Sequence, residues 1–170
     1  SIVSWNMSLL DKEAVKRAEK ALKDFDYSLS IIVLEDSARS AKEAALSLNC
    51  EVGAIVKSLL FRTEDYFVLS LVAGDKRCSL NKLKKLTKKK DISMASPEEV
   101  KTQTGYTIGG VSPVGHLNKL KILIDNSLER FKELYAAAGH PNCVFKTNLK
   151  SLQEITNGEI KEITEWDNQK

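Results

Sequence analysis

A lysine within an apolar run is the first residue whose type and position suggest chemistry. Lys57 lies in residues 54–61, which read AIVKSLLF. If this run is a strand, Lys57 shares one face with Ile55, Leu59 and Phe61, because side chains alternate between the two faces. An ammonium among such neighbours loses hydration unless an anion or a hydrogen-bond acceptor compensates for the loss. The run predicts either a functional lysine or an edge-strand lysine whose ammonium reaches water.

A glycine-rich segment is the second feature. Residues 105–113 read GYTIGGVSP, with the adjacent Gly109 and Gly110 followed by Pro113. Glycines let a backbone approach a ligand closely and present N–H groups to developing negative charge. The spacing matches neither the dinucleotide-binding fingerprint nor the phosphate-binding P-loop. By itself the segment also fits an ordinary turn.

The third feature is a histidine that follows a run of small residues. Residues 136–142 read AAAGHPN, which suggests a tight wall beside the imidazole of His140. A lone histidine is more often a structural group than a catalyst, so this segment alone assigns no function. His116 receives no role. Ser58 and Ser112 have no triad partner evident in the sequence, although a triad is recognised by geometry.

Composition describes an ordinary globular chain of 170 residues, with 42% hydrophobic residues, 29% charged residues and a formal net charge of +3. This size supports one domain with a hydrophobic core, expected over residues 1–170. No apolar run approaches the roughly 20 residues of a membrane helix, and the N-terminal residues lack the features of a secretory signal. We therefore expect a cytoplasmic protein with no membrane association.

The cysteines and histidines are few and scattered. Three cysteines and two histidines, with no C-x-x-C spacing, argue against a disulfide framework and against a zinc site. No metal and no cofactor are expected. The charge is clustered only between Lys82 and Lys90, where six lysines could contact phosphates, although a solvated helix face is the more common arrangement.

Four segments carry helix-start signals, in which a serine precedes an acidic residue or a proline, or opens an amphipathic run. Ser8 with Asp11 predicts a capping box for a first helix whose apolar stripe extends to Phe25. The later helices are expected to begin at Ser40, Ser79 and Ser96, and a last helix lies near residues 149–155.

Apolar and β-branched runs indicate the strands. Residues 54–62 and 66–73 predict a hairpin, and residues 28–34 are strand-like by their β-branched content. Short apolar runs follow at residues 121–124, 134–138 and 143–146. Hairpins mixed with separate helices predict an α+β fold with a largely antiparallel or mixed sheet.

Five segments occur in a characteristic order along the chain: 50–59 (CEVGAIVKSL), 72–75 (VAGD), 94–100 (MASPEEV), 104–113 (TGYTIGGVSP) and 138–142 (AGHPN). Together they closely resemble the YbaK family, which includes the editing insertion of bacterial prolyl-tRNA synthetases and its free-standing relatives. The resemblance spans roughly residues 14–163. It implies a single α+β editing domain, whose mixed, mostly antiparallel sheet curls into a barrel-like core with surrounding helices.

The resemblance also implies a function and its residues. Members hydrolyse the ester between an amino acid and the terminal adenosine of tRNA, commonly on mischarged prolyl-tRNA, and the implied partners are aminoacyl-tRNA and prolyl-tRNA synthetase. The family's essential lysine corresponds to Lys57, its G-x-x-x-P loop to residues 109–113, and the Gly-His of many free-standing members to Gly139 and His140. The implied catalytic residues are Lys57, Gly109, Gly110 and His140; the implied substrate-binding residues are Val111, Ser112, Pro113, Gly139 and Asn142; the candidates for tRNA contacts are Lys82, Lys85 and Lys89.

The implied chemistry needs no obvious protein base, because family relatives are thought to use a ribose hydroxyl of the tRNA to help activate water. Backbone N–H groups of residues 109–112 would stabilise the oxyanion, and Lys57 would hold the terminal adenosine or the carbonyl oxygen. His140 would shape the pocket or orient the water. Alanine, serine, cysteine and threonine all remain open as the amino acid removed.

Two other interpretations stay open. One is a non-catalytic tRNA- or synthetase-binding module of the same fold, whose complexes would survive loss of Lys57. The other is a hydrolase for a different ester or thioester that uses a Ser112–His140 pair, in which Ser112→Ala would abolish activity.

Overall fold

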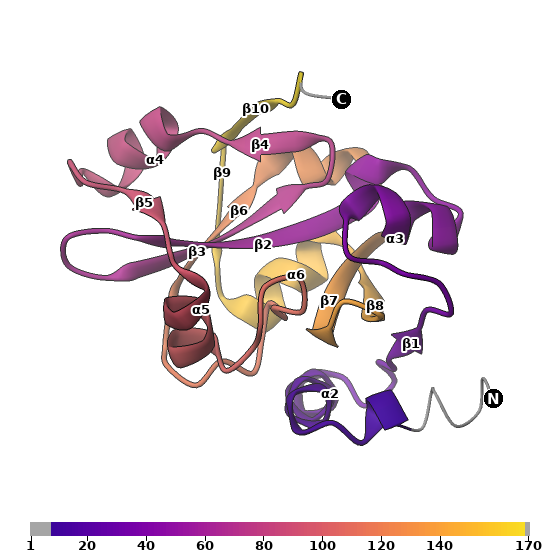
Figure 1. Cartoon of the computed structure of the whole chain (residues 1–170). Coiled ribbons are helices and arrows are strands. Elements are labelled where there is room, and N and C mark those ends of the chain that lie inside the picture. The colour runs from indigo at the N-terminus through magenta and orange to yellow at the C-terminus, as the bar shows by residue number, and fades with distance from the viewer. Residues whose placement is uncertain (1–7, 169–170) are drawn as a thin grey trace.

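The computed structural model describes residues 8–168 and is built on one mixed sheet (Figure 1). Its strands run in the order β1-β8-β7-β2-β3-β6-β9, with β5 paired to β2 outside this path. The strands are β1 (Ile32–Val33), β2 (Ile55–Arg62), β3 (Phe67–Ala73), β5 (Ser93–Met94), β6 (Lys121–Asp125), β7 (Leu134–His140), β8 (Cys143–Thr147) and β9 (Glu159–Lys161). A separate pair joins β4 (Lys76–Cys78) to β10 (Thr164–Trp166).

Helices lie on both sides of the sheet. They are α2 (Glu13–Phe25), α3 (Ala41–Leu48), α4 (Leu80–Thr87), α5 (Pro97–Thr104) and α6 (Leu149–Thr156), with 3-10 turns η1 (Val52–Ala54) and η2 (Asn126–Arg130). In Figure 1, α2, α5 and α6 lie below the long β2–β3 hairpin, and α3, α4 and the β4–β10 pair lie above it.

The sheet confirms the expected α+β class with a mixed, mostly antiparallel sheet. β2 pairs antiparallel with β3 over seven residue pairs from Val56 to Arg62, as the predicted hairpin requires. Parallel pairing joins β2 to β7, β3 to β6 and β6 to β9. Within residues 8–168 no pairing joins the edge strands β1 and β9, so these pairings do not close a barrel.

The core is divided between the two faces of the sheet. On the lower face one large cluster joins Leu22 of α2 and Leu152 of α6 to inward side chains such as Leu60 and Leu69. The upper face carries two smaller clusters. One lies under α4 and includes Phe61 and Val72, and the other lies under α3 and includes Ile55 and Val144. Lys57 falls between these two clusters, because it follows Ile55 and precedes Leu59 on the same strand face.

Three of the four predicted serine helix starts are confirmed. Ser40 and Ser96 each form a complete capping box with the glutamate three residues later, and the Ser79 side chain accepts from the N–H of Lys82. These contacts satisfy backbone N–H groups that would otherwise lack a partner at a helix start. The local sequence therefore sets where α3, α4 and α5 begin.

Ser96→Ala is expected to lower the free energy of unfolding by about 1 kcal/mol, because it removes the N-cap acceptor of α5. The Ser96 hydroxyl oxygen accepts from the N–H of Glu99 at 3.1 Å. Urea unfolding of the variant measures this loss. Ser96→Asp is the control, since it keeps an acceptor oxygen at this position; equal losses in both variants would contradict the capping explanation.

Two local predictions are wrong. Residues 8–10 form a short helical turn, but α2 itself starts at Glu13 after an uncapped Lys12, so Ser8 and Asp11 do not cap the main helix. Phe25, at the end of the predicted apolar stripe, is 44% exposed. The expected strand 28–34 shrinks to β1, because only Ile32 and Val33 pair with β8 and the preceding residues have no strand partner within the described chain.

Candidate active site

A pocket of about 360 Å³ opens along one edge of β2. β2 pairs with β7 at Ile55 and Val56, and with β5 at Phe61 and Arg62. Residues 57–59, which lie between these two pairings, line the pocket. The other walls are Ala38, Arg39, Ser40, Ala41 and Ala44 around the start of α3, Ile108, Gly109 and Val111 from the glycine-rich loop, and Tyr135, Ala137, Pro141 and Val144.

Lys57 lies where this pocket meets β4. Its Nζ donates a hydrogen bond to the carbonyl oxygen of Lys76 at 2.5 Å. Burial lowers the pKa of Lys57 below its ordinary value of 10.5, while the nearby carboxylates of Asp167 and Asp75 act in the opposite direction. The ammonium is thus half-buried, bound to a backbone acceptor and close to carboxylates. This arrangement favours a functional lysine over one that simply reaches water from an edge strand.

The glycine-rich loop packs directly against the end of β7. The N–H of Gly139 donates to the carbonyl oxygen of Gly110 at 3.0 Å. A Cβ at Gly110 would lie 2.9 Å from the Cα of His140, so a side chain there would separate the two segments. Gly109 has a φ of +89° and lies against Pro141. Two motifs that are separate in the sequence therefore form one wall.

His140 stands behind this wall. Its Nδ1 accepts a hydrogen bond from the N–H of Asn142 at 3.0 Å, which assigns the ring proton of the neutral form to Nε2. Burial lowers the pKa of His140, and Lys12 acts in the same direction, so the neutral imidazole is favoured near pH 7. Within the described chain His140 is not among the side chains that line the pocket of β2.

Asn142 supports the wall opposite the loop. It is buried, and its side-chain nitrogen donates to the carbonyl oxygens of Leu34 at 3.0 Å and Asp36 at 2.7 Å. These bonds tie the segment before α3 to the turn after β7. The structure thus gives Asn142 a structural part in shaping the pocket.

The other residues of the glycine-rich loop have different positions: one lines the pocket, and two are buried beside it. Val111 lines the pocket. Ser112 is fully buried, and its hydroxyl oxygen accepts from the N–H of Val114 at 3.2 Å. Pro113 is buried and lines a different hollow. A fully buried and hydrogen-bonded Ser112 is poorly placed to act as a nucleophile.

Ser58 is a pocket residue to which the sequence assigned no role. The residue is part of the pocket wall, and its hydroxyl oxygen is buried without a hydrogen-bond partner among the described residues. The sequence feature that could have pointed to Ser58 is its position as a polar residue in the middle of an apolar strand.

Only one of the predicted small residues before Gly139 reaches the pocket. Ala137 lines it, whereas Ala136 and Ala138 belong to the large lower cluster. Side chains alternate between the two faces of a strand, so Ala137 points to the opposite side of β7 from Ala136 and Ala138. Further small side chains come from Ala38, Ala41 and Ala44, around α3, and these were not foreseen from the sequence.

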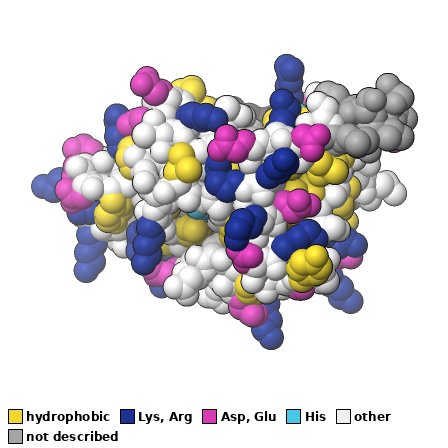
Figure 2. Space-filling model, turned by 90° about the horizontal axis from the view of Figure 1, so that it is seen from below, with side chains coloured by type: hydrophobic (Ala, Val, Ile, Leu, Met, Phe, Trp, Pro, Cys, Tyr) yellow, Lys and Arg dark blue, Asp and Glu magenta, His cyan; other side chains and the backbone are white. Residues whose placement is uncertain are grey.

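The three lysines predicted to contact tRNA differ in their surroundings. Lys82 donates to the carbonyl oxygen of Thr164 at 2.6 Å, and Lys89 forms an ion pair with Asp65. Lys85 is exposed on α4. The face of the molecule opposite α4 carries Lys and Arg side chains spread over its surface (Figure 2). Basic side chains are therefore not confined to α4.

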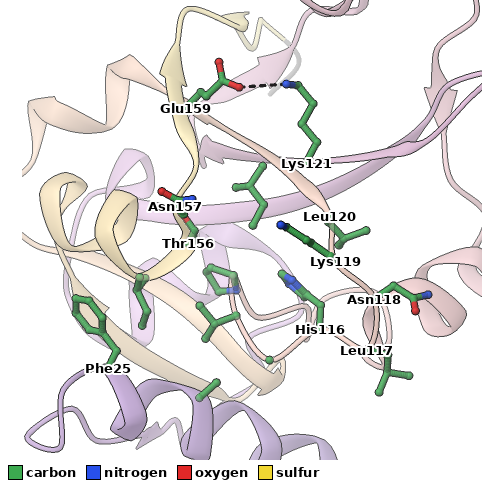
Figure 3. Close-up of a pocket in the computed structure, with 16 residues that line it drawn as sticks. Phe25, His116, Leu117, Asn118, Lys119, Leu120, Lys121, Thr156, Asn157 and Glu159 are labelled. Atoms are coloured by element: carbon green, nitrogen blue, oxygen red, sulfur yellow. Dashed lines mark hydrogen bonds and ion pairs between the residues drawn. The ribbon is translucent and has the colours of Figure 1, made fainter.

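A second, more open hollow of about 610 Å³ lies on the lower side, between the end of α2, residues 113–122 and the end of α6 (Figure 3). His116 lies in it, with its Nε2 bonded to the carbonyl oxygen of Ser112 at 2.6 Å. Burial lowers the pKa of His116. Lys121 and Glu159 form an ion pair across the rim at 3.1 Å. Lys57 and Gly109 do not line this hollow, so it is separate from the pocket of β2.

Three further observations concern metal binding, the cysteines and the membrane. Within residues 8–168 no group of three or more His, Cys, Asp or Glu side chains is placed to hold a metal ion. The three cysteines are free thiols. No helix in the described part of the chain is both long and apolar enough to span a membrane.

Comparison with known proteins shows which family the chain belongs to. Residues 35–155 match the model of the aminoacyl-tRNA editing domain. The chain is 36% identical to YwhH of Bacillus subtilis, over 72% of this chain and 78% of that protein. It is also 36% identical to the proline–tRNA ligase of Kosmotoga olearia over 70% of this chain, but the match spans 19% of the ligase. A solved structure described as a candidate trans-editing enzyme for prolyl-tRNA synthetase has 37% identity and a TM-score of 0.86, covering 91% of this chain and 98% of that one.

Proposed function

Because the chain belongs to the aminoacyl-tRNA editing domain family, we propose that it is a deacylase that acts in trans on mischarged tRNA. The bond cleaved is the ester between a small noncognate amino acid and the terminal adenosine, with tRNA(Pro) as the first tRNA to test. One observation carries the proposal: Lys57 and the glycine-rich loop line the same pocket of about 360 Å³. These are residues that the family resemblance implies for the reaction.

The pocket has groups suited to ester hydrolysis. An aminoacyl ester is already activated, so the protein must hold it, admit water and stabilise the oxyanion. The N–H of Gly110 already donates to the carbonyl oxygen of Thr107 at 3.0 Å, so the loop donors proposed for the oxyanion are the N–H groups of Gly109, Val111 and Ser112. The Lys57 ammonium supplies a charge-assisted donor for the carbonyl oxygen or the adenosine. His140 lies directly behind Gly110, so its part is to support the loop or to orient water.

The dimensions of the pocket favour a small substrate side chain. Its walls include the small side chains of Ala38, Ala41, Ala44 and Ala137. A second, size-selective site is useful because a synthetase pocket separates substrates that differ by one methylene by only ~1–3 kcal/mol. Alanine, serine, cysteine and threonine are the candidates on these grounds.

The test is hydrolysis of tRNA(Pro) charged separately with alanine, serine, cysteine, threonine and proline. We expect rapid loss of one or two noncognate esters and slow loss of prolyl-tRNA(Pro). The same tRNAs, uncharged, measure binding in parallel. Binding without hydrolysis above the spontaneous rate would contradict the catalytic proposal and support the binding-module interpretation. A Ser112-dependent hydrolase is disfavoured by the full burial of Ser112.

Partners and location follow from the same proposal. Aminoacyl-tRNA is the substrate, prolyl-tRNA synthetase is the natural source of the mischarged species, and the cytoplasm is the compartment in which both occur. Lys85 is the exposed one of the three lysines proposed to contact tRNA.

A further inference from the structure

The last described strand, β10, pairs with the strand that holds the acceptor of Lys57, although β10 lies outside the residues matched by the family model. β10 pairs with β4 in the register Thr164 to Cys78 and Trp166 to Lys76. The N–H of Asp167 then donates to the carbonyl oxygen of Asp75 at 3.3 Å, which continues the pairing by one residue. The carbonyl of Lys76, which accepts from Lys57, therefore belongs to a strand that β10 holds in place.

Side-chain contacts also hold β10 against β4 and η2. The Trp166 ring lies 4.1 Å from the Lys76 ammonium and 5.2 Å from the Arg130 guanidinium. Arg130 also binds both carboxylate oxygens of Asp75, at 2.8 and 2.9 Å. Cation–π contacts and a bidentate ion pair thus join β10, β4 and η2 around the Lys57 site. In Figure 1 this end of the chain lies beside β4, on the upper side of the sheet.

Three titratable groups face Lys57 from the elements packed around it: Asp75, Cys78 and Asp167. Burial raises the pKa of Cys78 to about 11, so this thiol is neutral near pH 7. The Asp75 carboxylate is paired with the Arg130 guanidinium, which lowers the pKa of Asp75. Asp167 acts on Lys57 more strongly than Asp75 does. Asp167 lies across from Asp75 in the β4–β10 pairing, next to the residue pair Trp166–Lys76, and the carbonyl oxygen of Lys76 is the acceptor of Lys57.

We propose that Asp167 is a positioning residue for Lys57, carried into place by β10. Its carboxylate keeps the ammonium charged and directed toward β4, so the C-terminal strand is part of the editing site. This inference rests on the proposed function, because it assigns Asp167 to the same site. It adds a contribution from residues that the family model does not include.

The experiment measures the charge state of Lys57 directly, so that it does not depend on catalysis. Trace acetylation of amines with acetic anhydride, from about pH 6 to about pH 10, is quantified by mass spectrometry on the peptide that contains Lys57. Only the neutral amine reacts. Asp167→Asn is expected to move the labelling curve of Lys57 to lower pH with an unchanged plateau, and to reduce deacylation several-fold. Asp167→Glu, which keeps the carboxylate, should restore both.

Glu165→Gln is the matched control on the same strand, because Glu165 pairs with Arg77 rather than with Lys57. Its labelling curve should match that of the unmodified protein. An unchanged curve in Asp167→Asn would overturn the proposal. A higher plateau without a change in midpoint would also overturn it, since the strand would then only shield the lysine. If the unmodified protein hydrolyses no ester, the proposed function fails, while the labelling curves still decide the role of Asp167.

Discussion

Lys57→Ala is expected to lower kcat/KM for the mischarged ester about 100- to 1,000-fold, the range found when one donor to a developing oxyanion is removed. The physical reason is that a half-buried ammonium offers a charge-assisted hydrogen bond that water cannot replace in the pocket. Single-turnover hydrolysis of the best substrate from the tRNA panel measures the loss. Lys57→Arg should recover only part of the rate, because the planar guanidinium needs more room than the ammonium.

The stability of a Lys57 variant separates a functional lysine from a structural one. Lys57→Met keeps the apolar stem and removes the charge, so we expect an inactive protein that is as stable as the unmodified one at pH 7 or more stable. A large loss of both stability and activity would instead indicate a structural lysine. Retention of activity in Lys57→Met would contradict the proposed mechanism.

The pH dependence of stability follows from the direction of the pKa shift. The unfolded chain titrates Lys57 near 10.5, and burial lowers the pKa in the folded protein. Below the lowered pKa both states carry the charge, and the folded state bears the full desolvation cost. Between the lowered pKa and 10.5 the unfolded chain binds more protons, so this contribution to the free energy of unfolding rises with pH. Lys57→Met should remove that rise.

Gly139→Ala is expected to lower the free energy of unfolding by about 3 kcal/mol, from backbone strain and a steric clash together. Gly139 has a φ of +94°, and a Cβ there would lie 2.6 Å from the carbonyl oxygen of Ala14 in α2. That backbone cannot shift freely, because the next residue, Val15, is fully buried in the large lower cluster. Urea unfolding measures the loss, and deacylation should fall with it as the wall behind Gly110 is displaced.

Gly109→Ala is the matched control for this effect. Gly109 also has a positive φ, of +89°, but the nearest atom to its Cβ position is the Cγ of Pro141 at 3.3 Å. In Gly109→Ala the free energy of unfolding should therefore fall by about 1–2 kcal/mol, mainly from backbone strain. The difference between the two variants isolates the clash with α2. Equal losses would show that the contact between α2 and β7 is not the cause.

Local signals predicted the parts of the fold that depend on neighbouring residues. The capping boxes at Ser40 and Ser96 were found because their hydrogen bonds span three residues. The β2–β3 hairpin was found because alternation and a short turn determine its register. The predicted start of the first helix was wrong. Ser8 and Asp11 have side chains that can cap a helix, but the chain leaves the helical conformation after them and α2 begins only at Glu13.

The candidate site was predicted only in part. Lys57, Gly109 and Val111 line one pocket, as the family resemblance implied they should lie together, although it did not give the pocket's other walls. Ser58 was considered from the sequence only as a triad candidate, because only the buried environment shows that its hydroxyl has no partner in the described chain. Asn142 was expected at the substrate, yet its amide binds the carbonyl oxygens of Leu34 and Asp36, which are more than a hundred residues away.

The sequence by itself determined the candidate residues for the chemistry: an ammonium in an apolar strand, a glycine pair and a Gly-His step, because residue type and short-range spacing set these properties. The tertiary structure alone decided what surrounds them. The parallel pairing of β2 with β7 at Ile55 and Val56 leaves the strand edge at Lys57 to form the pocket, and β10 brings Asp167 to a lysine 110 positions earlier. Contacts between distant segments depend on how the whole sheet is assembled, and no local pattern contains that information.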